Sequence, residues 1–93
     1  MTEEIWVVIT KTPGEYIVGR AVDIDFNGGF IQFEEPAIMR IAGGPSISFS
    51  SFKVIEAVLY VNFRDAYGIS KLKSEYVTTY NQWLRLQSET PNA

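Results

Sequence analysis

Asp23 and Asp25 are the residues of this chain that come closest to forming a chemical site. One residue separates them in a segment rich in β-branched side chains, so in a strand both would project from one face. Such a pair could bind Mg²⁺ or exchange protons. The chain has no histidine, and no third carboxylate is clearly placed beside the pair. We therefore favour a solvated strand face over a metal-dependent enzyme, and we predict no catalytic residue, no metal site and no cofactor.

Other residue types that often carry chemistry lack the partners they would need. Gly28-Gly29 and Gly43-Gly44 do not have the spacing of phosphate-binding loops, and we interpret both pairs as turns. The serines between residues 46 and 51 have no histidine to activate them as nucleophiles. Lys71 and Lys73 are interpreted as solvated side chains, with phosphate contact as the alternative.

Composition indicates the class of protein and its compartment. A chain of 93 residues suits one domain, residues 1–93, and 46% hydrophobic residues argue against disorder. The absence of cysteine favours a reducing, intracellular compartment, and we expect a cytoplasmic protein. The longest apolar run, residues 57–61, is too short to span a membrane, so no membrane partner is expected.

Charge is distributed unevenly along the chain. The net charge is −3, which is unusual for a nucleic-acid-binding protein. Residues 1–36 have a balance of −5, and the remaining residues have a balance of +2. The second part could therefore form a less acidic face.

The elements that would position these residues are mostly strands. Hydrophobic alternation and turn residues predict strands at 5–10, 15–25, 30–35, 46–55 and 57–63, with 37–42 as a continuation of the third beyond Pro36. The second strand is long enough to bend, and Gly19 with Ala21 leaves room for a close backbone approach. Asn27-Gly28-Gly29 is typical of a tight turn.

The apolar spacing then changes to that of a helix. Steps of three and four from Ile69 to Leu84 predict a C-terminal helix at 69–88, with Ser70 as its N-cap and 89–93 as a tail. Tyr76, Tyr80 and Trp83 lie on its apolar stripe. We favour packing of this stripe on the protein's own sheet or on a neighbouring subunit over base stacking.

Three stretches of the chain resemble the Sm/LSm family. The first motif is matched by Val18-Gly19-x-Ala21-x-x-x-Asp25, the turn 27–29, and Phe30-Ile31-x-Phe33-Glu34. Residues 58–61 look like the strand that closes the second motif, and residues 30–52 fit the third and fourth strands with their variable loop. Residues 53–57 lack the family's Arg-Gly pair, and the helix follows the strands instead of preceding them. The short Sm-like proteins of marine phages are the nearest kind, and phage origin would imply the host cytoplasm.

The resemblance implies a mainly β fold, a small, strongly bent, five-stranded antiparallel Sm-like (SH3-like) barrel with a C-terminal α-helix. It also implies a homo-oligomeric ring, pentamer to heptamer, in which the fourth strand of one subunit pairs with the fifth of the next. The expected interface residues are Phe49, Phe52, Val58, Tyr60 and Val61. Single-stranded RNA or DNA would contact Asp25, Asn27, Gly29, Lys53 and Arg40, with Arg20 as a further candidate.

Two functions from different classes therefore stay open. The first is an Sm-like ring that binds single-stranded RNA or DNA and serves nucleic-acid processing. The second is a structural or assembly protein on a small β-barrel with no nucleic-acid role, which the acidic balance favours. Affinity for an oligonucleotide at low salt distinguishes the two.

Overall fold

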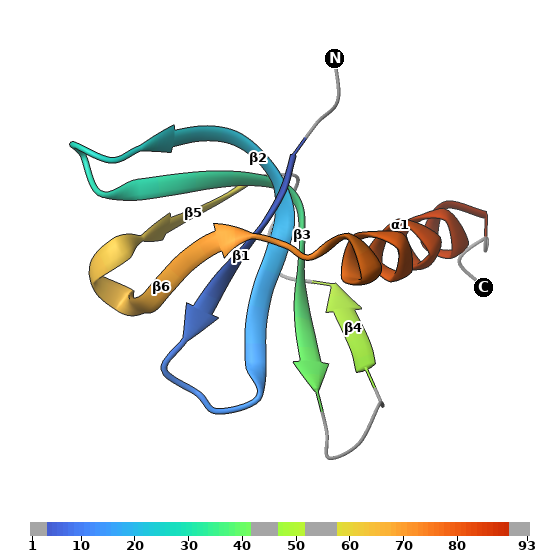
Figure 1. Ribbon diagram of the computed structural model, residues 1–93. Coiled ribbons are helices and arrows are strands. Elements are labelled where there is room, and N and C mark those ends of the chain that lie inside the picture. Colours follow the sequence, from blue (N-terminus) through green and yellow to red (C-terminus); the bar gives the residue numbers. More distant parts are fainter. Residues whose placement is uncertain (1–3, 42–46, 52–57, 90–93) are drawn as a thin grey trace.

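The computed structural model describes residues 4–41, 47–51 and 58–89. It is mainly β, with one bent antiparallel sheet and one C-terminal helix (Figure 1). The strands are β1 (Ile5–Thr10), β2 (Glu15–Asp25), β3 (Phe30–Ile41), β4 (Ile47–Ser51), β5 (Val58–Asn62) and β6 (Ala66–Lys71). A short 3₁₀ helix, η1 (Phe63–Asp65), joins β5 to β6, and the α-helix is α1 (Ser74–Glu89).

The strands pair in the order β4-β3-β2-β1-β6, and β5 also pairs with β3. Residues 30–34 of β3 pair with β5, and residues 37–41 pair with β4. Consequently β4 and β5 lie one after the other along the same edge of β3. The opposite edge of the sheet is β6, which pairs with β1.

The bend of the sheet occurs where β2 and β3 lose register. Val18 pairs with Ala37 and Arg20 pairs with Glu34, so Gly19 lies opposite the two residues Glu35 and Pro36. A Cβ at Gly19 would lie 3.2 Å from the carbonyl oxygen of Glu34, which confirms the close backbone approach expected there. Glu35 has a φ of 51°, a left-handed conformation that costs most residues roughly 1–2 kcal/mol.

Two hydrophobic clusters lie on opposite faces of this sheet, which explains why β1 is apolar on both of its faces. Val8, Ile31 and Phe33 are buried on the inner face, and Trp6 and Ile69 pack against them. The outer cluster lies under α1, and its buried members are Ile5, Val7, Val18, Ala37, Met39 and Tyr80.

The helix packs on the protein's own sheet, one of the two possibilities that the sequence left open. Rings of α1 contact a ring of β4: Phe49 lies 5.9 Å from Tyr80 and 5.7 Å from Trp83, measured between ring centroids. The Tyr80 hydroxyl donates a hydrogen bond to the carbonyl oxygen of Glu35 at the bend.

The structure corrects two details of the predicted elements. The described residues form six strands where the sequence predicted five, because residues 66–71 form β6. The helix therefore begins at Ser74, and neither Ile69 nor the predicted N-cap Ser70 belongs to it. Ile69 packs into the inner cluster from a strand, so its helix-like spacing from Leu72 is coincidental. Pro36 does not end β3, since it lies at the bulge, where the ladder needs no donor.

No helix in the described part of the chain is both long and apolar enough to cross a membrane.

Candidate functional site

The turn between β2 and β3 holds three of the predicted nucleic-acid-binding residues together. Asp25 closes this turn from within: its Oδ1 accepts a hydrogen bond from Gly28 N at 2.7 Å, and its carbonyl oxygen accepts one from Gly29 N at 2.7 Å. A Cβ on Gly28 would lie 2.5 Å from Asp25 Oδ2, and Gly29 has a φ of 77°. Asp25 and the glycines thus shape the turn, and the side chain of Asn27 is exposed on it.

Aromatic rings surround this turn, and sequence reasoning assigned them no role. Phe26 is 68% exposed and contacts Phe63 of η1 with 5.8 Å between ring centroids. Phe63 N also donates to the carbonyl oxygen of Gly29 at 2.8 Å, which ties the turn to η1. Tyr67 is 75% exposed because it is the extra residue where β6 shifts register against β1.

A cavity of about 250 Å³ opens between these rings, lined by Phe26, Phe63, Ala66, Tyr67, Gly68 and Ile69. Exposed aromatic faces can stack on bases of any sequence. The pattern that could have identified the site is the run of aromatic residues on both sides of the Asn27-Gly28-Gly29 turn and after β5. That pattern has no fixed spacing in the sequence, because only the tertiary fold brings the residues after β5 next to the β2–β3 turn.

Arg40 lies far from this turn, at the other end of the β2–β3 ladder. It pairs with Glu15, the first residue of β2, whereas Asp25 is the last. A strand of 11 residues extends about 30 Å, so the two ends cannot contact one bound nucleotide.

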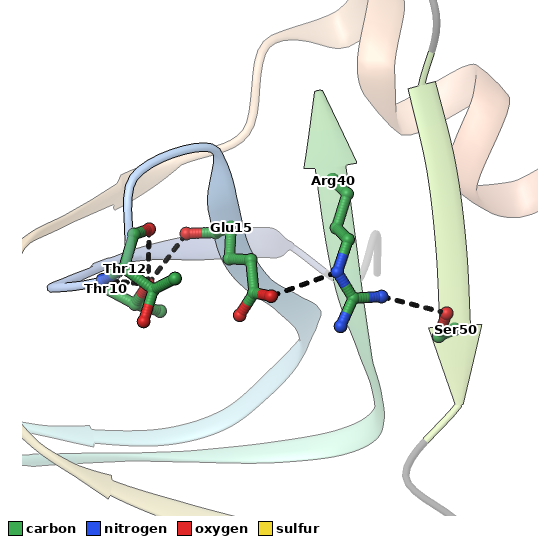
Figure 2. A network of polar contacts seen from close by, with 5 residues as sticks. All are labelled: Thr10, Thr12, Glu15, Arg40 and Ser50. Carbon is green, nitrogen blue, oxygen red and sulfur yellow. Dashed lines mark hydrogen bonds and ion pairs between the residues drawn. The ribbon is translucent and has the colours of Figure 1, made fainter. Parts of the chain in front are cut away.

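Arg40 is also engaged within the protein (Figure 2). Its Nε donates to Glu15 Oε2 at 3.0 Å, and its Nη1 donates to Ser50 Oγ at 3.3 Å. The neighbouring turn is held by the Thr10 hydroxyl, which donates to the carbonyl oxygen of Glu15 at 2.8 Å. These contacts tie β1, β2, β3 and β4 together, which is a structural role.

Arg20 lies between the two ends, at the bend. Its Nη2 is 3.2 Å from Glu34 Oε1 and 2.7 Å from Glu35 Oε1. The guanidinium thereby forms ion pairs with two adjacent carboxylates and balances one of their two charges. Lys53, the remaining predicted contact, lies outside the described residues.

The predicted interface residues have different environments. The ring of Phe49 packs under α1, and Val61 packs against the inner cluster, so both support the fold of their own chain. Tyr60 is 63% exposed, and its ring lies 5.9 Å from that of Phe30. Val58 belongs to β5, and Phe52 lies outside the described residues.

The carboxylate pair remains without a third ligand in the described part of the fold. Asp23 is exposed and Asp25 is half-buried and engaged with Gly28. Within residues 4–41, 47–51 and 58–89, no three acidic side chains gather closely enough to hold a metal ion, and the chain has no histidine or cysteine.

The chain matches no protein-family model, and a comparison with curated proteins finds no similar sequence.

Proposed function

We propose that this protein is an Sm-like, ring-forming protein that contacts single-stranded RNA or DNA through the turn at residues 25–29. The observation that carries the proposal is a bent antiparallel sheet whose two edges, β4 with β5 and β6, carry a single charge between them. β5 contains no charged residue and no proline, and β6 has one charge, on its last residue, Lys71. Natural proteins usually protect sheet edges with charges, prolines or bulges, and β4 and β5 have none of these, so their edge suits pairing with another chain.

The strand order revises which strands would pair between subunits. The sequence suggested that 46–55 of one subunit pairs with 57–63 of the next, but β4 and β5 lie on the same edge of β3. In the revised proposal, the edge formed by β4 and β5 pairs with β6 of the next copy. Because the two edges differ, the contact is heterologous and closes into a ring when the rotation between copies fits.

The surroundings of the turn support a nucleic-acid role. Asn27 offers an amide to hydrogen-bond a base, and Phe26 and Tyr67 offer exposed ring faces for stacking. One such contact is weak, but a ring repeats it in every subunit, so a bound strand gains from several contacts at once.

A second candidate is an assembly protein with the same edge pairing and no nucleic-acid role. The specific observation in its favour is the engagement of Arg20 and Arg40 with glutamates of their own chain. Together with the net charge of −3, these ion pairs leave few cations to attract phosphates.

Native mass spectrometry at low salt, with an oligo-uridine in excess, tests both candidates. We expect a closed oligomer of five to seven copies that carries RNA and loses it as salt is raised. Replacing the exposed Tyr60 by lysine (Tyr60→Lys) should convert the ring to monomers, because a charge on an edge strand opposes pairing. Val22→Lys is the matched control, since Val22 is 50% exposed on β2, a central strand, and should leave the ring intact.

The possible outcomes distinguish between the two proposed functions. A ring that takes up no oligonucleotide supports the assembly protein. A wild-type monomer, or a Tyr60→Lys variant that still forms the ring, contradicts edge pairing.

A further inference from the structure

The outer face of the sheet carries an open pocket where α1 does not cover it. Its volume is about 330 Å³, and it lies between the start of the helix and strands β1, β2 and β3. In Figure 1, α1 follows β6 and extends away from the β1–β2 turn. The volume is at the small end of the range for ligand-binding pockets.

The lining of this pocket is mostly apolar. Val7 and Met39 are buried members of the outer cluster and take part in the lining, together with Ile9, which is 40% exposed. Leu72 contributes from the segment that precedes the helix. An alkyl chain lying in this pocket would itself leave water, which favours binding by about 0.8 kcal/mol for each methylene group that it buries.

Two ammonium groups also belong to the lining. Lys71 Nζ is 3.0 Å from Glu4 Oε2, so its charge is already partly balanced. Lys73 makes no ion pair with another described residue, and its exposed side chain is available to an anion. The lining thus combines an apolar surface with an available positive charge, in a protein whose net charge is negative.

We infer that this pocket binds a small anionic amphiphile, a medium-chain alkyl carboxylate or alkyl phosphate, with its chain on the Val7–Met39 surface and its anionic group at Lys73. The inference is independent of ring formation and of nucleic-acid binding.

Isothermal titration calorimetry of the full chain with octanoate, below its micelle-forming concentration, tests the inference. We expect saturable binding of octanoate and octyl phosphate, about fivefold weaker binding of octanol, and weaker binding still of octylamine, as expected for an exposed charge contact. Lys73→Glu should weaken octanoate binding at least about fivefold and leave octanol binding unchanged. Ile9→Asp should weaken the binding of both octanoate and octanol, because it places a charge in the apolar lining.

Arg64→Glu is the matched control for Lys73→Glu, since it makes the same change of charge at an exposed position in η1. An equal loss of octanoate affinity in Lys73→Glu and Arg64→Glu would overturn the inference, because it would indicate a general effect of the protein's charge. Equal affinity for octanoate and octanol would overturn it as well. Binding to anionic phosphatidylglycerol vesicles without any binding of monomeric octanoate would also contradict it, since that result indicates a membrane surface and no pocket for a single ligand.

Discussion

At the residue scale, Tyr80 connects the helix to the bend in the sheet. Its side chain is fully buried, and its hydroxyl donates to the carbonyl oxygen of Glu35. Glu35 has left-handed backbone geometry, so its carbonyl points away from the regular ladder and takes its hydrogen bond from a side chain. Burial raises the pKa of Tyr80 well above its usual value, and the nearby Glu35 carboxylate adds to the rise.

We expect Tyr80→Phe to lower the free energy of unfolding by roughly 0.5–1.5 kcal/mol, because it removes the part-buried hydrogen bond to the carbonyl oxygen of Glu35. Urea unfolding followed by circular dichroism at neutral pH measures this loss. A change below about 0.5 kcal/mol would show that water replaces the hydroxyl.

The raised pKa of Tyr80 also predicts a pH dependence. Below the ordinary tyrosine pKa of 10.0, Tyr80 is protonated in both the folded and the unfolded state. The contribution of Tyr80 to the free energy of unfolding is then fully present. Above pH 10 the unfolded state loses the proton first, so the free energy of unfolding falls as pH rises. We expect the free energy of unfolding of Tyr80→Phe to fall less above pH 10 than that of the wild-type protein. An equal fall in both proteins would show that other groups cause it.

At the scale of elements, the helix acts as a cover for the outer face of the sheet. Its inward residues Tyr80 and Trp83 stack on each other with ring centroids 6.2 Å apart, and both contact Phe49 of β4. Leu86, on the same helix, is 58% exposed. The helix therefore depends on its contacts with the sheet, because a 16-residue helix is only marginally stable alone.

We expect Trp83→Ala to lower the free energy of unfolding by roughly 2–3 kcal/mol, which is less than for a fully buried aromatic residue because Trp83 is half-buried. Leu86→Ala is the control, and it should change stability by less than about 0.5 kcal/mol, as is usual for surface positions. Thermal unfolding at several protein concentrations measures both. A loss of stability in Trp83→Ala that grows as the protein is diluted would indicate that the Trp83 side chain lies in a contact between subunits.

At the scale of the whole molecule, the fold leaves different edges on its two sides. β1, β2 and β3 have paired strands on both sides, whereas β5 and β6 each pair on one side in the described structure. In a monomer, the outward amides of β5 and β6 would exchange with solvent faster than those of the central strands.

We expect hydrogen exchange to reveal edge pairing in the assembled protein. Amides in residues 58–62 and 66–71 should be protected nearly as well as those of β2, and Tyr60→Lys should remove the protection of both segments together. Mass spectrometry of peptic fragments measures the exchange. Fast exchange at both edges in the wild-type protein would contradict the ring.

The sequence by itself determined the elements whose signals are local. The bounds of β1 and β2, the bend near Gly19, the turn at Asn27-Gly28-Gly29 and the presence of a C-terminal helix follow from side-chain period and from backbone geometry that glycine permits. These properties depend on residues that are close in the sequence, so they can be predicted from the amino-acid sequence alone.

The features that depend on distant residues could be seen only in the folded chain. Ile69 has helical spacing, yet its segment became a strand because β1 offered a free edge and the side chain of Ile69 packs against the inner cluster. Pairing of Glu15 with Arg40 placed Arg40 and Asp25 at opposite ends of one ladder, so these two predicted nucleic-acid-binding residues lie apart. The aromatic group at Phe26, Phe63 and Tyr67 likewise exists because η1 returns to the β2–β3 turn. In each case the deciding contact joins residues far apart in sequence, and hydrophobic period carries no information about such contacts.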